Sequence, residues 1–166
     1  PITTFDFSGG IATSLGWSTG GGEPSYAFTK YEGGTPSYQT GPSAGVGGSG
    51  SYVYAETSSP RVQGDLFTLA YDGSACSGTG VGVSTVAFHY HMYGSSMGEL
   101  RVANAAGVVV WSLSGDQGTS WQVATTDIYS PSFIFEYTRG DGYKGDAAVA
   151  QVTVSCGVVP PVPPPP

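Results

Sequence analysis

Short alternations of apolar and polar residues recur along the chain, a pattern typical of half-buried β-strands. They predict ten strands: Thr3–Phe7, Ser25–Tyr31, Ser51–Glu56, Asp65–Ala70, Ser84–Tyr93, Gly98–Ala103, Gly107–Leu113, Ser120–Thr126, Ser132–Thr138 and Ala147–Ser155. Clusters of Gly, Ser, Thr, Pro and Asp separate these segments, and no run of ten residues shows a helical period. The expected fold class is therefore all-β, with two packed antiparallel sheets in a β-sandwich or jelly roll.

The last predicted strand alternates without interruption. One face carries Ala148, Ala150, Val152 and Val154, and the other carries Gln151, Thr153 and Ser155. Cys156 continues the apolar face, so we predict that it lies on the core side, within reach of a partner from the opposite sheet.

The length of 166 residues fits one domain with a sizeable core. We expect this domain to span residues 1–157 and the proline-rich stretch 158–166, VVPPVPPPP, to be a linker, because consecutive prolines favour an extended rod that cannot join a sheet. No stretch approaches the roughly 18 apolar residues of a membrane span, so we expect no membrane insertion by this domain.

Charge and cysteine content narrow the function further. Charged residues make up 10% of the chain, and its five basic residues are scattered, which argues against nucleic acid as a partner. The two cysteines, Cys76 and Cys156, favour a disulfide over a metal site in this Gly- and Ser-rich chain. A bridge closing so long a loop stabilises the fold by roughly 4–5 kcal/mol in the chain-entropy description and implies an oxidising, extracellular or periplasmic compartment.

Six segments carry a family resemblance. They are FDFSGG…LGWST (5–19), GGTPSYQTGPS (33–43), GSYVYAETS (50–58), FHYHMYGSSMGELRV (88–102), VVWSLSGDQGTSWQ (109–122) and FIFEYTRGDGYKGDAAV (133–149). In this order they resemble the MAM domain, an extracellular module named after meprin, a neuropilin and a receptor tyrosine phosphatase. The resemblance covers residues 5–157 and implies a jelly roll without catalysis that works in adhesion or protein–protein recognition.

The family usually has four cysteines, whereas this chain has two. The positions of the first pair read Phe5 and Leu15, so Cys76 and Cys156 correspond to the second pair. We expect the two apolar side chains to replace the lost bridge by hydrophobic contact, since burying both contributes a few kcal/mol. This hypothesis requires both side chains to be buried.

Some MAM domains bind a structural calcium ion. The resemblance suggests ligands near the first strand, in the loop after Gly-Pro-Ser and in an acid pair of the last strand, where this chain has Ser8, GPSAGVGG and Ala150-Gln151. Calcium takes six to eight oxygen ligands, several of them usually carboxylates. We therefore expect no cofactor, with calcium as the alternative, for which the remaining candidate ligands are Asp6, Glu56 and Asp146.

The segment EYTRGDGYKGD (136–146) contains Arg-Gly-Asp at 139–141, the tripeptide that integrin ligands display on loop tips. The family has a glycine-rich turn at this place, so we interpret the segment as structural. Its glycines are expected to supply positive φ angles, at Gly140, Gly142 and Gly145. We expect Asp146 to accept hydrogen bonds from backbone N–H groups of the same turn.

One predicted strand offers a candidate ligand surface. His89 and His91 lie on one face with Tyr93, while the opposite face, with Val86, Phe88, Tyr90 and Met92, would point into the sandwich. Zinc needs a further ligand, and the chain has no third histidine, so we expect no metal at the two histidines. His89, His91 and Tyr93 remain a candidate binding strip for a sugar.

The tryptophans favour a core role. Trp111 and Trp121 flank SLSGDQGTS, a predicted hairpin with its tip at 115–118, and we expect both, like Trp17, to be buried in the core.

Catalytic signatures are missing from the sequence: it has neither a Gly-x-Ser-x-Gly elbow between a strand and a helix nor a His-Glu-x-x-His zinc motif. We expect a non-enzymatic adhesion or recognition module, secreted or at the cell surface, whose partner is an extracellular protein, a copy of itself included. The alternative is a carbohydrate-binding module with a glycan ligand, and a third reading is a structural spacer.

Overall fold

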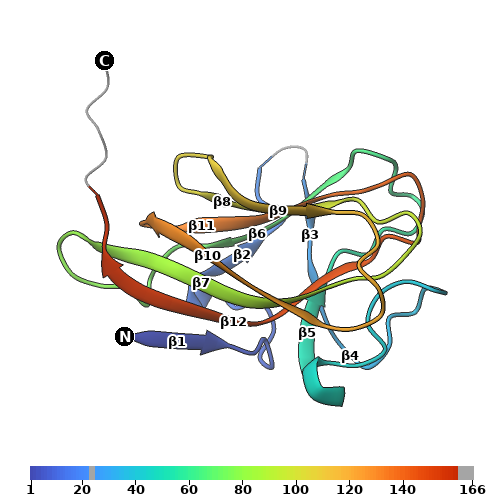
Figure 1. Cartoon of the computed structure of the whole chain (residues 1–166), viewed down its shortest axis with the longest axis horizontal. Coiled ribbons are helices and arrows are strands. Elements are labelled where there is room, and N and C mark those ends of the chain that lie inside the picture. The colour runs from blue at the N-terminus through green and yellow to red at the C-terminus, as the bar shows by residue number, and fades with distance from the viewer. Residues whose placement is uncertain (23–24, 161–166) are drawn as a thin grey trace.

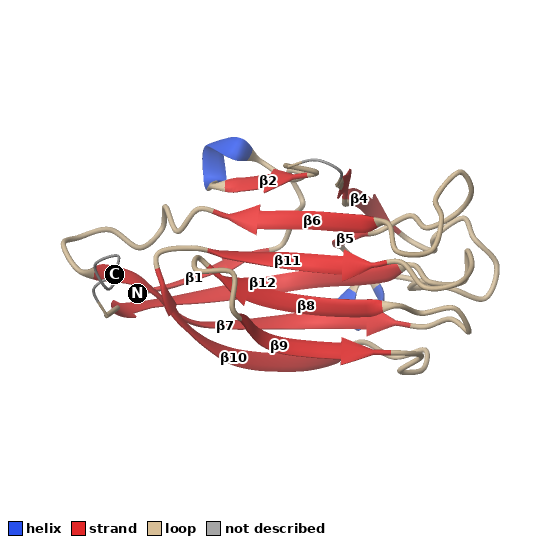
Figure 2. Ribbon diagram, turned by 90° about the horizontal axis from the view of Figure 1, so that it is seen from above, coloured by secondary structure: helices blue, strands red, loops and turns tan. Residues whose placement is uncertain are grey.

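The computed structural model describes residues 1–22 and 25–160 and shows two sheets packed face to face (Figures 1 and 2). The first sheet has the strand order β10-β7-β12-β5-β4, and β1 also pairs with β12. Its strands are β1 (Ile2–Phe5), β4 (Thr29–Glu32), β5 (Ser51–Tyr54), β7 (Val81–Met92), β10 (Gln122–Ser130) and β12 (Ala147–Val158).

The second sheet has the order β2-β6-β11-β8-β9, with β3 beside β6. Its strands are β2 (Trp17–Thr19), β3 (Tyr26–Ala27), β6 (Leu66–Tyr71), β8 (Glu99–Asn104), β9 (Val109–Ser114) and β11 (Phe133–Thr138). Two short 3-10 turns, η1 (Thr13–Leu15) and η2 (Val46–Gly48), complete the elements. The pairings are antiparallel except for β3 with β6, so the expected all-β jelly roll is confirmed.

Within the part of the chain that the structure describes, no helix is long and apolar enough to cross a membrane.

The core lies between the two sheets and is rich in aromatic rings. Trp17 is buried in contact with the rings of Phe5, Tyr71 and Phe133. Val86, Phe88 and Met92 of β7 are also buried in this core, as the alternation of that strand predicts. Trp111 is half-buried, with its ring 5.0 Å from that of Phe88.

One predicted strand is in fact two. The segment 25–31 divides at Phe28, a buried residue, into β3 of the second sheet and β4 of the first. The Phe28 N–H donates to Thr19 Oγ1 (2.7 Å), a bond from the short strand β2 that the alternation did not predict. Burial of the Phe28 ring therefore coincides with the passage of the chain from one sheet to the other.

The prediction for the last strand is confirmed for Val152 and Val154, which are buried in the core, and wrong for Ala148 and Ala150. The register between β12 and β7 shifts at Gln151, whose φ is 48°. An extra residue in a strand reverses the side-chain alternation that follows it. The residues before Gln151 therefore alternate in the opposite phase from Val152 and Val154. Ala147 and Val149 face the core, whereas Ala148 and Ala150 pack on the outer face against tyrosines of β5.

The proposed replacement of the first disulfide is also wrong. Phe5 is buried, with its ring 5.4 Å from Trp17 and 5.2 Å from Tyr71. Leu15 ends the 3-10 turn η1 and is 55% exposed, because the turn carries it to the surface before Gly16 (φ 96°) redirects the chain. The chain start is therefore held by Phe5 and by the ladder between β1 and β12.

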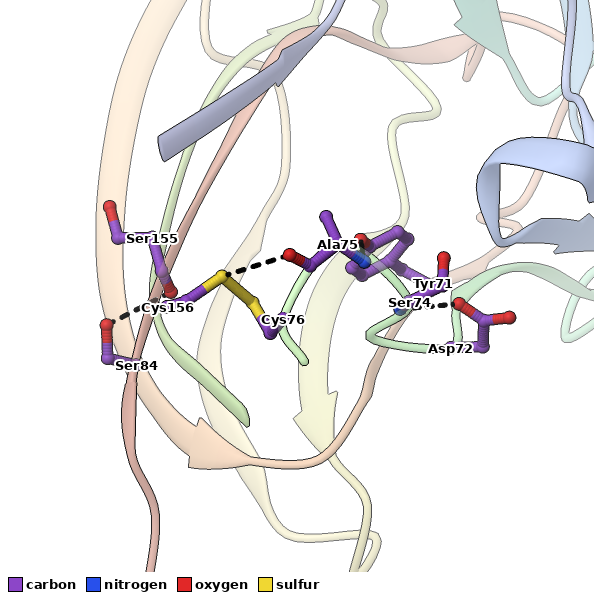
Figure 3. The surroundings of a disulfide bond; sticks show 8 residues. All are labelled: Tyr71, Asp72, Ser74, Ala75, Cys76, Ser84, Ser155 and Cys156. Carbon is purple, nitrogen blue, oxygen red and sulfur yellow. Dashed lines mark hydrogen bonds between the residues drawn. A yellow bond between two sulfur atoms is a disulfide. The ribbon is translucent and has the colours of Figure 1, made fainter. Parts of the chain in front are cut away.

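Cys76 and Cys156 form the expected disulfide, with their Cα atoms 5.3 Å apart (Figure 3). Both are half-buried, and Cys76 lies in the loop between β6 and β7. The partner of Cys156 therefore comes from a connection between the sheets and not, as predicted, from a strand of the opposite sheet. Beside the bridge, the Ala75 N–H donates to the Tyr71 hydroxyl (2.8 Å).

The sheet extends beyond the expected domain boundary at residue 157. Val158 belongs to β12 and pairs with Val81, and the Val159 N–H donates to the Gly80 carbonyl (2.9 Å). The remainder of the expected proline-rich linker, 161–166, lies outside the described residues.

The segment 115–121 is not a hairpin tip. It leads from β9 in the second sheet to β10 in the first, so it crosses between the sheets at one end of the sandwich. Trp121, at its end, is half-buried against Tyr52 on the outer face of the first sheet and not in the main core.

Candidate functional site

The Arg-Gly-Asp tripeptide has a buried arginine. Arg139 is 8% exposed, and its guanidinium donates to the carbonyl oxygens of Thr57 (2.7 Å) and Gly140 (3.1 Å). Of the three residues, only Asp141 is exposed. Since an integrin ligand must present both charged side chains, the structure agrees with the structural interpretation of this turn.

The glycines of this turn serve a different purpose from the one expected. None of the three has a positive φ. Instead, a Cβ atom on Gly140 would overlap the Ser96 carbonyl, and one on Gly145 would lie 2.8 Å from the same oxygen. On Gly142 it would lie 2.7 Å from Ser96 Oγ. The turn therefore needs glycine because it packs closely against the chain at Ser96.

Asp146 is fully buried beside this turn and bonds to a different loop from the one predicted. Its Oδ1 accepts hydrogen bonds from the N–H and the hydroxyl of Thr57, each at 3.0 Å. Its Oδ2 is buried without a hydrogen-bond partner in the described structure. We call Glu56, Thr57, Arg139 and Asp146 the turn cluster, because these residues join the loop after β5 to the turn before β12.

Burial, aided by the neighbouring Glu56 carboxylate, raises the pKa of Asp146 to about 7, although the Thr57 hydrogen bonds act to lower it. Glu56 has its own partners: it accepts hydrogen bonds from the Tyr54 hydroxyl (3.1 Å) and the Ser58 N–H (3.0 Å). A carboxyl group with a pKa near neutrality holds a proton at mildly acidic pH, so this buried position can respond to pH.

The three calcium candidates do not form one site. Asp6 is exposed, and its carboxylate accepts hydrogen bonds from the N–H and hydroxyl of Ser8. No group of three or more His, Cys, Asp or Glu side chains suited to a metal occurs in residues 1–22 and 25–160. Glu56 and Asp146 are adjacent, but two carboxylates alone fall short of the oxygen set that calcium takes.

The proposed strip of His89, His91 and Tyr93 is not an open surface. His91 is 1% exposed, and its ring packs against Trp121 at a centroid distance of 5.3 Å. Its Nε2 lies 3.0 Å from the Thr119 carbonyl, and burial lowers the pKa of the imidazole. His89 and Tyr93, on either side of His91, are half-buried. Because the residue between them is buried, the three side chains do not form a continuous exposed strip.

A depression of about 300 Å³ lies above this buried histidine. It is lined by the loop 43–48, His91 and the segment 119–121, and includes hydroxyl groups of serine and threonine. The Trp121 indole N–H donates to the Ala44 carbonyl (2.9 Å), which fixes the ring beside the depression. A fixed aromatic ring among hydroxyl groups suits a small polar ligand such as a sugar.

Strands β9 and β10 form what we call the open edge, the side of the sandwich where each is the last strand of its sheet (Figure 2). The Thr126 hydroxyl donates to the Val110 carbonyl (3.3 Å) and links the two strands. Three large apolar side chains of these strands are exposed, Val109 (48%), Val123 (63%) and Tyr129 (51%), and so is Val108 (56%), directly before β9.

This surface was not predicted, although the sequence holds a signal for it. The strands β9 and β10 contain neither lysine, arginine nor proline, and their only charged residue is Asp127. Edge strands of monomeric proteins commonly carry charges or proline that prevent strand pairing. Nearly uncharged edge strands with exposed valines therefore suit contact with another protein.

Comparison with known families finds one match that covers most of the sandwich. The model of the MAM domain, meprin/A5/mu, matches residues 12–157, which agrees with the resemblance read from the six segments.

Curated relatives agree with this match. MAM domain-containing glycosylphosphatidylinositol anchor protein 1 of Gallus gallus is 40% identical over 135 residues, which cover 73% of this chain and 14% of that protein. Its counterpart from Homo sapiens is 40% identical over 136 residues, with the same coverage. The chain thus spans about a seventh of the length of these relatives.

Two solved structures share the fold at low sequence identity. The K2 cleaved adhesin domain of Lys-gingipain has a TM-score of 0.63 and 14% identity, covering 93% of this chain and 99% of that one. The CBM27-1 module of Caldicellulosiruptor saccharolyticus, solved in complex with mannohexaose, has a TM-score of 0.61 and 11% identity, covering 93% and 96%. At these identities the likeness concerns the fold alone.

Proposed function

Because this chain belongs to the MAM domain family, we propose that it is a non-catalytic extracellular module that recognises other proteins. The observation that carries this proposal is the open edge. It combines two edge strands, four exposed apolar side chains and a single carboxylate on one side of a rigid, disulfide-linked sandwich. Exposed apolar groups gathered on one side of a domain are typical of protein contact surfaces.

The domain is extracellular. Its disulfide fits the oxidising compartments in which such bonds persist, and the curated relatives are named for a glycosylphosphatidylinositol anchor. The turn cluster is largely buried, and its Thr57 and Arg139 side chains make internal hydrogen bonds, so the cluster does not offer a competing contact surface.

A cell-binding assay tests the proposal. Fluorescent oligomers of the domain are applied to cells before and after mild trypsin treatment of the cell surface, and after enzymatic removal of surface glycans. We expect binding that trypsin removes and glycan removal leaves intact. Val123→Lys should weaken this binding, whereas Val62→Lys, a loop residue that is 60% exposed, should not. Trypsin-resistant binding, or none to any extracellular protein, would contradict the proposal.

Glycan binding is the second candidate, and the depression beside Trp121 favours it. Its fixed indole ring could stack on a sugar face while the surrounding hydroxyls bind sugar hydroxyls. A glycan array tests this, with Ser120→Trp as the variant that fills the depression from an exposed position. His91→Ala is a poor probe, because His91 is buried and its loss would disturb the packing of Trp121.

A further inference from the structure

We propose that two copies of this chain associate by antiparallel pairing of their β10 strands, so that the first sheet of one copy continues into that of the other. This inference rests on the proposed function, since it names the partner that would occupy part of the open edge. Three features of β10 support it: an unpaired backbone edge, the side chains along the strand and the register that its charge permits.

The backbone of β10 is available for pairing along its outer side. In the part of the chain that the structure describes, its only ladder partner is β7, from Gln122 to Asp127 in unbroken register before a shift near Tyr129. Six residues in regular register match the length of a typical strand. An unpaired strand edge of this kind is a template for adding a further strand.

The other outer strands are less suited to this pairing. The strand β4, at the far side of the same sheet, has only four residues and carries Lys30 and Glu32. The strand β2 has three residues. On the open edge, β9 has a register shift against β8 between Val102 and Ala103. The regular half of β10 is therefore the best template among these strands.

The side chains of β10 alternate between the exposed outer face of the first sheet and the face that packs on the second sheet. Val123, Thr125 and Asp127 are exposed on the outer face, while Ala124 and Thr126 are half-buried toward the second sheet. Valine and threonine are favourable residues for cross-strand pairs, because their branched side chains pack well on a pleated surface. Pairing would thus cover Val123, the most exposed of the large apolar side chains of the open edge.

Charge selects the register. With the twofold axis at Ala124, Val123 of one copy faces Thr125 of the other, and Asp127 faces Trp121. A register with the axis at Asp127 would place two carboxylates directly opposite each other, which is destabilising. The net charge of −7 opposes association of two copies as a whole, and β10 offers a contact where only one acidic residue per chain lies in the strand.

The opposed pair Val123–Thr125 makes the register testable by charge. In the double variant Val123→Lys/Thr125→Lys, lysine faces lysine twice across the axis, so the dimer dissociation constant should rise about tenfold or more. In Val123→Lys/Thr125→Glu, each lysine faces a glutamate of the other copy, and association should return toward that of the natural chain. Val62→Lys, which adds one charge at a similarly exposed valine, should leave association unchanged.

Sedimentation equilibrium of the folded chain from micromolar to millimolar concentration measures these effects. The natural chain should show a monomer–dimer equilibrium that strengthens with added salt, because salt screens the repulsion between two acidic copies. Circular dichroism of each variant verifies that its sandwich is intact. A natural chain that stays monomeric at every concentration, or a Lys/Lys variant that dimerises unchanged, would overturn the inference.

The outcomes separate this inference from the proposed function. A monomeric chain that still binds a trypsin-sensitive cell-surface protein overturns β10 self-pairing and leaves the recognition function standing. A dimer that binds no other extracellular protein supports self-pairing and contradicts the proposed recognition of other proteins.

Discussion

In the turn cluster the sequence suggests a binding motif that the structure buries, whereas the open edge has no motif in the sequence and is exposed in the structure. The turn spells an adhesion tripeptide, but its arginine is buried by hydrogen bonds to two backbone carbonyls. The open edge contains no motif, yet it exposes valines on strands that lack basic residues and proline. A segment can therefore serve as a binding surface only if its side chains are accessible, and hydrogen bonding and strand order decide whether they are.

The largest expected effect comes from removing the arginine of the turn cluster. Arg139→Ala leaves the Thr57 and Gly140 carbonyls without their charged donor, which should cost about 4 kcal/mol of unfolding free energy and lower the melting temperature by roughly 10 °C. Asp141→Ala, at an exposed neighbour, should change stability by less than about 0.5 kcal/mol.

Thermal denaturation of both variants checks this contrast. The comparison between the two regions breaks if Arg139→Ala proves as stable as the natural chain, or if Asp141→Ala abolishes attachment of integrin-bearing cells, because the tripeptide would then be accessible.

The next effect concerns pH. The pKa of Asp146 is about 7 in the folded chain and 3.8 in an ordinary carboxyl group, so between these values the folded state holds a proton that the unfolded state has lost. Stability should therefore fall as pH rises through this window, by about 2–3 kcal/mol between about pH 5 and about pH 8. Urea unfolding at a series of pH values measures the fall.

The buried His91 changes stability with pH in the opposite direction, so the measurement requires a control variant. Burial lowers its pKa below 6.5, so its contribution is present above that pH and is lost as pH falls. Asp146→Asn keeps an oxygen that accepts hydrogen bonds from Thr57 and cannot ionise. The difference between this variant and the natural chain isolates Asp146, and an unchanged pH dependence would show that Asp146 is already ionised.

Much of the fold could be predicted because side-chain alternation reports strands directly. The same alternation failed where a single backbone event changed the phase. The bulge at Gln151 reversed the faces of Ala148 and Ala150, and the burial of Phe28 divided a strand between two sheets. Such events depend on what the opposite sheet offers, which local pattern does not contain.

The candidate site was less predictable than the fold. His89 and His91 share a face as expected, but only contact with Trp121, from a distant segment, determined that His91 is covered. The bonds from Arg139 and Asp146 to Thr57 likewise join positions more than eighty residues apart. Edge strands become visible only when the order of strands in each sheet is known.

On the open edge, a substitution should have little effect on folding. The side chain of Val123 is 63% exposed, so Val123→Lys should change the unfolding free energy by less than about 0.5 kcal/mol. Together with the weaker cell binding expected of Val123→Lys, this separates the open edge from the turn cluster, where substitutions act on stability. Chemical denaturation at low protein concentration measures the monomer alone, and a loss above about 2 kcal/mol would mean that Val123 supports the sandwich itself.

The smallest expected effect is that of calcium, which bears on the turn cluster because Glu56 and Asp146 belong to it. Calcium needs several ionised carboxylates, whereas Glu56 is occupied by a tyrosine hydroxyl and a backbone N–H, and Asp146 retains a proton near neutral pH. Since only about half of the Asp146 carboxyl groups are ionised at pH 7, we expect the same melting temperature in calcium and in chelator at that pH. A higher melting temperature in calcium, abolished by Glu56→Gln but not by Asp6→Asn, would instead make the turn cluster a cation site and give it a ligand of its own.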